Sequence, residues 1–406
     1  MPSCSACDFD LTQVVPTTVR KWNWILPGQH LTLAETRLKR NLPKSKSNQL
    51  TRRLIDWFAV NARDLPWRRT SDPYAIWVSE IMLQQTQVKT VIPYFERWMK
   101  LVPDVRRLSR LSSNRLHKLW EGLGYYTRAR NLQRAARQIV TDHGGVFPDS
   151  CDDILKLPGI GRYTVGAVGS VAFNQPVPLV DGNVIRVLSR LFGIRGNPKD
   201  RQVSEQFWET AGEIVAAAGR MRTAFKPDNA ALKISGNCSA LNQSLMELGA
   251  TICAPRNPDC GACPVARLCH ANNSDCVDGL PEIPQRAKAT ERRFVAFIVQ
   301  RGSKYLVRRR PPGVVNAHLW EFPNSEGSPD EEDPVQSAAE QLGFQTVDTE
   351  LCARLKHSIT RYRITLECHR LMNPEAHALP AHGFYTREQI GKLPFTAAHQ
   401  KLLQYL

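Results

Sequence analysis

The chain has 406 residues, of which 42% are hydrophobic and 23% charged, and this length is enough for two or three globular domains. It contains no run of eighteen apolar residues, so the sequence excludes a membrane-spanning helix. Lys and Arg number 54 against 38 Asp and Glu; the net charge of +16 favours a polyanionic partner such as nucleic acid, with a merely basic soluble protein as the alternative.

Residues 1–47 show no sustained periodicity and contain several prolines, so we expect a loosely ordered extension. They lack the charged-then-apolar pattern of a signal peptide, which favours an intracellular location: the cytoplasm of a bacterium or the nucleus of a eukaryote. Cys4 and Cys7 form a CxxC pair, but no second pair lies nearby, and two free thiols are the favoured interpretation.

Residues 48–273 are predicted to be mostly α-helical. Apolar residues recur at three- and four-residue intervals in LTRRLIDWFAV, in YAIWVSEIMLQQTQVKTVIPYFERWMKLV and in NRLHKLWEGLGYYTRARNLQRAARQIVTDH. Turn signals with Pro, Gly and Asp separate these stretches. One insertion-like segment, KPDNAALKISGNCSALNQ at residues 226–243, is predicted to be a surface loop.

One of these predicted helices holds a carboxyl group among apolar neighbours. In IWVSEIMLQQTQV, Glu80 is flanked by Trp77, Val78, Ile81 and Met82. Apolar surroundings raise a carboxyl pKa towards neutrality, which suits a general acid. The alternative is a glutamate on the solvent side of an amphipathic helix.

A glycine-rich turn precedes another predicted helix. Gly159, Gly161 and Gly166 lie in LPGIGRYTVGAV, where small residues would let backbone amides approach a phosphate oxygen, although a turn before a helix explains them equally well. About twenty residues later, Asp181 precedes Gly182 in PLVDGNVIRVLSRL and opens a further helix. It is either a functional carboxylate or an N-cap.

Four cysteines form a compact cluster. Cys253, Cys260, Cys263 and Cys269 are spaced C-x6-C-x2-C-x5-C, within seventeen residues. Four such thiolates can converge on one centre, as both Zn²⁺ and a [4Fe–4S] cluster require, and the uneven gaps favour iron–sulfur. Four unrelated thiols are the alternative. No open ligand position is implied, so we expect a structural role.

Residues 274–292 are rich in proline and charge and are predicted to be a linker, followed by an α+β domain at 293–406. RFVAFIVQRGSKYLVRRR is predicted to form two strands joined at Gly302 and Ser303, and ITRYRITLECHRL another strand. Helices are expected in PVQSAAEQLGF and in the C-terminal REQIGKLPFTAAHQKLLQYL.

The LPGIG turn, the Asp-Gly pair and the four-cysteine cluster together resemble the helix–hairpin–helix DNA glycosylase superfamily. Their order and spacing resemble its iron–sulfur branch, which holds endonuclease III and the adenine DNA glycosylases of the MutY family. The resemblance covers residues 48–275 closely, and residues 293–406 resemble the MutT-like (Nudix-fold) domain that follows the catalytic part in MutY enzymes. It implies a [4Fe–4S] cluster on the four cysteines.

The resemblance also implies catalytic roles. Glu80 matches the acid that protonates the departing adenine, and Asp181 matches the carboxylate that stabilises the sugar cation. Tyr163 and Asn183 match positions that orient Asp181 by hydrogen bonding. In bifunctional relatives the position of Tyr163 carries a lysine that forms a Schiff base; tyrosine cannot form that imine, so the resemblance implies base removal without strand cleavage.

Further positions match residues that contact DNA in the family. Trp67, Arg68 and Glu247 match the adenine pocket, with a buried Trp and a structural Arg as alternatives. A base inside a duplex must be flipped out and its place filled, and the positions that match the inserted wedge are Gln85, Thr86 and Tyr125. Phosphate contacts are expected at Arg128, Arg130, Gly159 and Gly161.

The C-terminal domain departs from a working Nudix hydrolase. Only Glu340 and Gly343 of the metal-binding pattern remain in QSAAEQLGF, so we expect no nucleotide hydrolysis. In MutY enzymes this domain recognises 8-oxoguanine through a Phe-Ser-His turn, where this chain has Ile359, Thr360 and Arg361. Thr360 keeps a hydroxyl for a base edge, while the aromatic and the histidine are replaced.

The sequence therefore predicts a monofunctional glycosylase that excises adenine opposite 8-oxoguanine or guanine, acting as a monomer on double-stranded DNA, with no membrane partner. The alternatives are a related monofunctional mismatch glycosylase of the endonuclease III branch with another target base, a catalytically silent DNA-binding protein, and a nucleotide pyrophosphatase. The presence of both Glu80 and Asp181 argues against the silent binder, and the missing glutamates argue against the pyrophosphatase.

Overall fold

The computed structural model describes residues 44–284, 288–327, 333–344, 348–359, 361–372 and 382–406. Cys4, Cys7 and Thr360 lie outside these ranges, as does the predicted extension up to residue 43. Among the helices that the structure describes, none is both long and apolar enough to cross a membrane.

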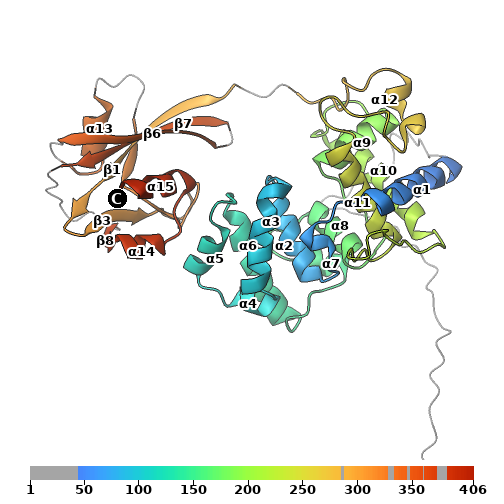
Figure 1. Cartoon of the computed structure of the whole chain (residues 1–406), viewed down its shortest axis with the longest axis horizontal. Helices are drawn as coiled ribbons and strands as arrows, with labels where there is room; N and C mark the ends of the chain where they lie inside the picture. The colour runs from blue at the N-terminus through green and yellow to red at the C-terminus, as the bar shows by residue number, and fades with distance from the viewer. Residues whose placement is uncertain (1–43, 285–287, 328–332, 345–347, 360, 373–381) are drawn as a thin grey trace, which may run out of the picture. The chain divides into compact units, whose positions relative to one another are not determined.

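The first region is helical, as predicted (Figure 1). Its α-helices are α1 (Lys44–Asn61), α2 (Pro73–Leu83), α3 (Val88–Leu101), α4 (Val105–Ser109), α5 (Ser113–Trp120), α6 (Thr127–Asp142), α7 (Cys151–Leu155), α8 (Arg162–Val171), α9 (Gly182–Phe192), α10 (Arg201–Gly219), α11 (Asn237–Thr251) and α12 (His270–Asn273). Two short 3-10 helices, η1 (Pro66–Arg68) and η2 (Ala266–Leu268), accompany them.

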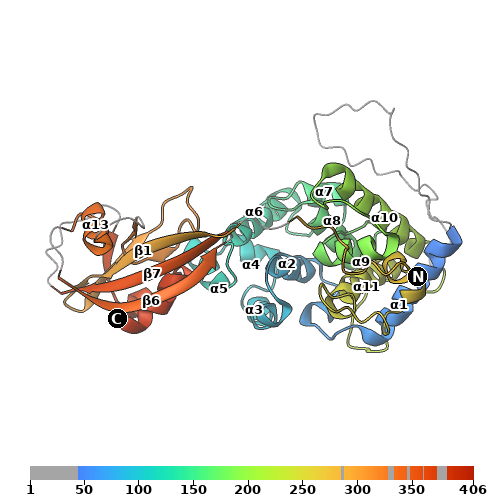
Figure 2. The same ribbon diagram turned by 90° about the horizontal axis from the view of Figure 1, so that it is seen from above.

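One core lies between α1, α9, α10 and α11, which run close together in both views (Figures 1 and 2). Leu54 and Phe58 of α1 pack there with Leu188 of α9, Ile214 of α10 and Leu245 of α11, all fully buried. The buried face of α1 begins at Ser47, one turn before Leu50, and the helix itself starts at Lys44 instead of the predicted boundary at 48.

The stretch from residue 74 to 102 is helical, as predicted, and forms two helices: Gln84 is the C-cap of α2, and Gln85 follows in a left-handed conformation with φ of 57° before α3 begins. One further prediction in the helical region is corrected. The predicted loop at 226–243 ends inside α11, whose residues Cys238 and Leu241 are buried in the core. Tertiary burial there outweighs the polar composition that favoured a loop.

The second region contains β-strands with helices on both sides, which confirms the α+β prediction. The strands are β1 (Thr290–Ile298), β2 (Gln300–Arg301), β3 (Lys304–Arg309), β4 (Trp320–Glu321), β5 (Asn324–Gly327), β6 (Thr349–Ile359), β7 (Tyr362–Leu371) and β8 (His382–Thr386). The helices are α13 (Pro334–Gln341), α14 (Arg387–Gly391), α15 (Ala397–Leu402) and the 3-10 helix η3 (Leu403–Tyr405).

One sheet has the order β5-β1-β7-β6, with β1 and β7 parallel and the other pairs antiparallel; β1, β7 and β6 lie side by side in Figure 2. The alternate residues of β1 enter two different cores: Ala296 and Ile298 pack with α14 and α15, whereas Val295 and Phe297 pack with α13. Because both faces are covered there, the second half of β1, Phe294 to Ile298, is a continuous apolar run.

The remaining strands pair as β2-β3-β4, with β8 on β3. β2 and β3 are joined at Gly302 and Ser303 as predicted, with Arg301 opposite Lys304. Two strand predictions are corrected: β1 begins at Thr290 inside the predicted linker, and the single strand expected at 359–371 is divided between the end of β6 and β7, which pair as a hairpin. Alternation continues through both strands, so periodicity alone does not reveal the turn between them.

Candidate active site

Glu80 lies in a helix that is buried on nearly all sides. Asp72 caps α2 by accepting a hydrogen bond from the Tyr74 amide at 3.0 Å, and every residue from Tyr74 to Met82 is buried. The side chain of Glu80 is therefore enclosed, with a residue exposure of 7%, and the solvent-side alternative is wrong. Burial raises the Glu80 pKa to about 7, against the opposing effect of a hydrogen bond from Tyr163.

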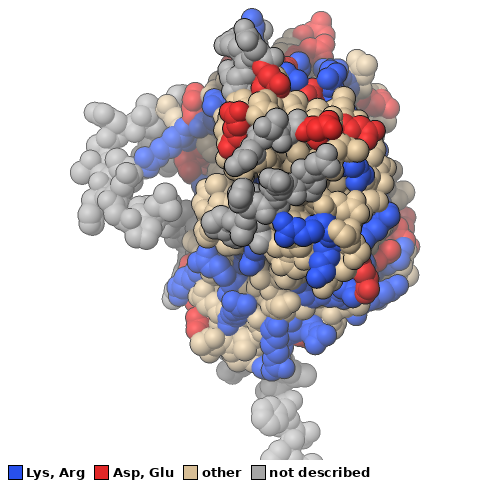
Figure 3. All heavy atoms as spheres, turned by 90° about the vertical axis from the view of Figure 1, so that its left-hand side faces the viewer, with Lys and Arg blue, Asp and Glu red and all other residues tan. Residues whose placement is uncertain are grey.

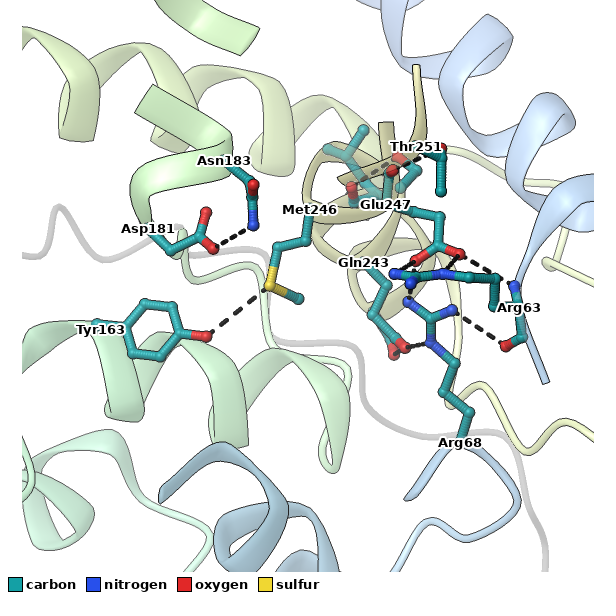
Figure 4. A network of polar contacts seen from close by, with 12 residues as sticks. Arg63, Arg68, Tyr163, Asp181, Asn183, Gln243, Met246, Glu247 and Thr251 are labelled. Carbon is teal, nitrogen blue, oxygen red and sulfur yellow. Dashed lines mark hydrogen bonds and ion pairs between the residues drawn. The ribbon is translucent and has the colours of Figure 1, made fainter. Parts of the chain in front are cut away.

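Tyr163 lies in the first turn of α8 and contacts the acid directly. Its hydroxyl donates to Glu80 Oε2 at 2.6 Å, and it also faces the Met246 sulfur at 3.8 Å (Figure 4). Burial, followed by the charges of Glu80 and Asp181, raises the pKa of Tyr163 well above its ordinary value, so the phenol stays a donor. The hydrogen bond that the resemblance implied towards Asp181 goes to Glu80 instead.

Asp181 is the N-cap of α9 and also lines the same cavity as Glu80. Its Oδ1 accepts from the Val184 amide at 2.7 Å, and its Oδ2 accepts from Asn183 Nδ2 at 3.0 Å (Figure 4). Burial raises its pKa, and these two bonds oppose the shift. The cap and the functional carboxylate are thus compatible, because capping fixes the orientation of a carboxylate that still borders the cavity.

The three glycines in and after the LPGIG turn meet different structural requirements. Gly159 has φ of +78°, and a Cβ there would come within 2.6 Å of the Asn131 side chain of α6. A Cβ at Gly166 would lie 2.0 Å from the Pro178 carbonyl oxygen, so α8 needs glycine to pass the chain that leads to Asp181. Gly161, the N-cap of α8, has open space where its Cβ would be.

A buried ionic network forms another part of the cavity wall (Figure 4). Glu247 of α11 accepts hydrogen bonds from Arg63 at 2.6 and 2.9 Å and from Arg68 at 2.9 Å, and Arg68 also donates to Gln243 at 3.0 Å. Burial by itself raises the Glu247 pKa, but the bonds and charges of the two arginines outweigh it and hold the pKa at about 2. Trp67, beside Arg68, is buried and borders the cavity.

Two members of this network, Arg63 and Gln243, are not among the site residues predicted from the sequence. Gln243 precedes Glu247 by four residues on α11, a spacing that places two side chains on the same helical face. That signal was available once residues 237–251 were recognised as a helix. Arg63 lies just beyond the end of α1, and no sequence pattern indicates it.

The three wedge candidates lie at two turns. Gln85 and Thr86 follow α2, and Tyr125 precedes α6 with φ of 48° and an exposure of 48%, whereas its neighbour Tyr126 is buried. A positive φ is strained for residues with side chains and is often found at functional sites. Gln85 and Tyr125 both line a second cavity of about 240 Å³, together with Gly159.

The expected phosphate contact of Arg128 is wrong. Its guanidinium donates to backbone carbonyls inside the protein, including those of Ile81 at 2.6 Å and Gln84 at 2.7 Å. The nearby Arg130 donates to Thr127 Oγ1 at 2.8 Å.

The main cavity has a volume of about 530 Å³, within the usual range for ligand pockets, and brings together side chains that are far apart in the sequence. Nine of the predicted site residues line this one cavity: Trp67, Arg68, Glu80, Gln85, Thr86, Tyr163, Asp181, Asn183 and Glu247. Tyr125 lies instead in the second cavity, which shares Gln84 and Gln85 with the main one. A buried acid that is half protonated near neutral pH and a second carboxylate in one cavity can cleave a glycosidic bond.

The four cysteines lie after α11 and around η2, at the edge of the helical core. The thiols of Cys260, Cys263 and Cys269 have raised pKa values, caused first by burial and then by the neighbouring cysteines of the group. Arg190 Nη1 donates to the Cys253 sulfur at 3.4 Å. Within the described ranges, however, no three Cys, His, Asp or Glu side chains are close enough to hold a metal ion.

In the C-terminal region, Glu340 lies in the last turn of α13 and accepts a hydrogen bond from Gln336 at 2.8 Å. Ile359 ends β6 and Arg361 precedes β7, where its guanidinium lies 5.1 Å from the ring centre of Tyr362. Lys and Arg side chains spread over much of the face shown in Figure 3, and acidic ones gather towards its upper edge. Exposed cations of this region include Lys304, Arg309, Lys356, Arg361 and Arg363.

Comparison with protein families matches both regions. Residues 78–213 match the HhH-GPD superfamily of base excision DNA repair proteins, and residues 294–405 match the NUDIX domain. The two matches fall on the helical region and on the α+β region, respectively.

Curated relatives are similar over most of the chain. The adenine DNA glycosylase of Rattus norvegicus is 31% identical over 414 residues, covering 87% of this chain and 77% of that protein. Those of Arabidopsis thaliana and Homo sapiens are 38% and 35% identical, each over 69% of this chain, and the chain spans about half of their length, 48% and 58%. Among solved structures, a thermostable thymine-DNA glycosylase is 29% identical with a TM-score of 0.48, covering 57% of this chain and 98% of that one.

Proposed function

Since the chain belongs to the adenine DNA glycosylase family, we propose that it removes adenine mispaired with 8-oxoguanine or guanine in double-stranded DNA and leaves an abasic site. The observation that carries this proposal is the pairing, in one cavity, of a buried Glu80 whose pKa is about 7 with the carboxylate of Asp181. Such a pair supplies the two functions that base excision needs: a proton for the departing base and a negative charge beside the sugar.

In the proposed mechanism Glu80 acts as the general acid. At neutral pH a large share of Glu80 is protonated, so it can give a proton to the adenine as the glycosidic bond breaks. The Tyr163 hydroxyl holds Oε2 of Glu80 in place by donating to it. Because Tyr163 has no amine, no Schiff base forms with the sugar, and the reaction ends at the abasic site.

Asp181 acts on the sugar of the adenine nucleotide. Its carboxylate, held by the Val184 amide and Asn183, stabilises the positive charge that develops on the sugar and supports attack by water. Both bonds exist before substrate binds, so little reorganisation is needed during the reaction. Trp67 and the network of Arg68 and Glu247 form the wall for the flipped adenine, while Gln85, Thr86 and Tyr125 fill the gap in the duplex.

For the cysteines, we propose that Cys253, Cys260, Cys263 and Cys269 hold a [4Fe–4S] cluster with a structural role. The residues fit the group in kind: they offer four soft sulfur ligands, the neighbouring cysteines add to the effect of burial in raising the pKa of Cys263, and the Arg190 cation lies beside Cys253. When bound, the cluster would cross-link the segment after α11. Iron and sulfide analysis of the purified protein, with visible absorption, tests this assignment, and zinc in place of iron would overturn it.

The proposed domains are a glycosylase domain at 48–273, a linker at 274–292 and a lesion-recognition domain at 293–406. In the last one, the turn at Ile359, Thr360 and Arg361 would contact 8-oxoguanine, without nucleotide hydrolysis. We further propose a monomer that works inside the cell on DNA; its net charge of +16 supports that partner.

The test uses purified protein and an end-labelled duplex with one adenine opposite 8-oxoguanine, analysed with and without hot alkali. Strand breakage that appears only after alkali is the expected result, because alkali cleaves an abasic site. Breakage without alkali would overturn the monofunctional claim. Parallel duplexes with other mispairs identify the alternative enzyme, since product from those alone would replace adenine as the target.

A further inference from the structure

We infer that Arg128 is a positioning residue that sets the two turns carrying Gln85 and Tyr125, so that both are in place before DNA is bound. The inference rests on the proposed function, because it concerns how the adenine is brought out of the duplex. It is carried by the hydrogen bonds of a single guanidinium group in the helical region.

The first turn that Arg128 fixes is the end of α2. Its Nη1 donates to the carbonyl oxygens of Ile81 at 2.6 Å, Met82 at 3.0 Å and Gln84 at 2.7 Å. The last carbonyls of a helix have no partner within the helix, and a cation that binds them stabilises this end. Gln85, with its positive φ, follows the last of these carbonyls immediately.

The second turn lies between α5 and α6. Arg128 Nη2 donates to the carbonyl oxygens of Leu123 at 2.9 Å and Gly124 at 3.1 Å, and to Thr86 Oγ1 at 3.4 Å. Tyr125, which also has a strained positive φ, follows Gly124 directly. The planar guanidinium of Arg128 therefore holds the backbone next to both strained residues. If either turn shifted relative to the other, some of its hydrogen bonds to Arg128 would break.

The surroundings of Arg128 exclude a role in binding phosphate. Its guanidinium lies 5.3 Å from the ring centre of Trp120 and 5.8 Å from that of Tyr125, and burial lowers its pKa to about 10. Its two terminal nitrogens are engaged by six acceptors, and Nε is buried without a hydrogen-bond partner among the described residues. The one donor without a partner, Nε, is buried and so cannot reach the DNA backbone.

The position of these turns matters because Gln85 borders both cavities and Tyr125 borders the smaller one. Backbone strain of this kind persists only where the surroundings impose it. A lysine keeps the charge of Arg128 but lacks the planar fork that reaches both turns at once. Replacing Arg128 by lysine should therefore loosen Gln85 and Tyr125 relative to each other without removing a positive charge.

The test compares Arg128→Lys with Arg134→Lys, a matched change at an exposed arginine of the same helix. Single-turnover adenine release is measured on two duplexes: one with adenine opposite 8-oxoguanine, and one with adenine opposite an abasic analogue, where no pairing holds the base in. We expect Arg128→Lys to lose about 10- to 100-fold on the first and less than about threefold on the second, and Arg134→Lys to match the wild type on both.

Two further readouts separate this role from others. Fluorescence of 2-aminopurine at the target position reports unstacking on binding, and we expect a smaller rise with Arg128→Lys than with the wild type. The salt dependence of DNA affinity should keep its slope, whereas a lost phosphate contact lowers the slope by about 1. An equal loss on both duplexes, a lower slope or an unchanged rate on the mispair would each overturn the inference.

The same experiment distinguishes failure of the proposed function. If the wild type releases no adenine from either duplex, the proposed reaction is wrong, and the 2-aminopurine signal alone then decides whether Arg128 positions the two turns. If the wild type is active and Arg128→Lys equals it in rate and fluorescence, the reaction stands and the positioning role falls.

Discussion

Two buried glutamates in the wall of one cavity have opposite acid–base character. Glu80 and Glu247 are 7% and 1% exposed, yet their pKa values are about 7 and about 2. Glu80 receives a hydrogen bond from a neutral phenol, whereas Glu247 is bound by the cations Arg63 and Arg68. Burial raises both pKa values, so the charge of the partner decides which carboxyl keeps its proton. Glu80 can therefore donate a proton, whereas Glu247 stays ionised and keeps its ion pairs with the two arginines.

The largest effect is expected from removing the proton donor. Glu80→Gln keeps the size of the side chain but has no acidic proton, and general-acid catalysis contributes about 10²- to 10⁴-fold, so we expect about a 10³-fold loss in single-turnover rate. DNA affinity should stay within a few-fold, because Glu80 is enclosed in the protein. An active Glu80→Gln enzyme would show that the acid lies elsewhere in the cavity.

The next largest effect is expected on stability, when the ionic network around Glu247 is broken. Glu247→Ala leaves the buried Arg68 without its charged partner, and breaking such a pair costs about 3 kcal/mol in the free energy of unfolding. Urea unfolding of both proteins measures the difference. Asp64→Asn, which breaks the exposed pair with Arg69, is the control and should change stability little. Equal losses of stability in the two variants would mean that the buried pair of Arg68 and Glu247 contributes no more than the exposed pair of Arg69 and Asp64.

The raised pKa of Glu80 also predicts how stability depends on pH. Its pKa is about 7 in the folded protein against 4.5 ordinarily, so between these pH values the folded state binds more protons than the unfolded state. Rising pH therefore lowers stability over this window. Glu80→Gln has no such group, and we expect it to be more stable than the wild type by about 2–3 kcal/mol at pH 8, with the gain fading towards pH 4.

Urea unfolding of the two proteins at several pH values measures this difference. A constant difference across the window would mean that Glu80 does not change protonation on unfolding.

The smallest effect is expected from removing the phenol hydroxyl of Tyr163. The bond from Tyr163 lowers the Glu80 pKa, so Tyr163→Phe should raise it and move the alkaline limb of the pH–rate profile to higher pH. The rate at the optimum should fall less than about tenfold, because a single neutral hydrogen bond is lost. The profile of kcat against pH is the measurement. A limb that moves to lower pH would mean that Tyr163 acts mainly on Asp181, as the resemblance implied.

The predictions that the structure confirmed depend on local sequence patterns. Periodicity separated a helical region from an α+β region, because burial of one face imposes a spacing of 3.6 or 2 residues on any chain. The sequence also indicated Asp181 as a candidate N-cap, because a cap contacts only the next few residues of the chain. Boundaries failed where contacts with distant segments extended an element: β1 pairs with β7 from Thr290 onward, and α11 is buried in the core from Cys238.

The sequence by itself thus determined which residue types are available: an acid in an apolar helix, a capping carboxylate, a tyrosine where a lysine would form an imine, and four closely spaced cysteines. Only the tertiary structure decided their partners. It paired Tyr163 with Glu80, directed Arg128 into the protein instead of towards DNA, and brought Arg63 to Glu247 and Arg68 to Gln243. Partners separated by tens to hundreds of residues are selected by packing, and packing fixes the surrounding charge and burial on which each pKa depends.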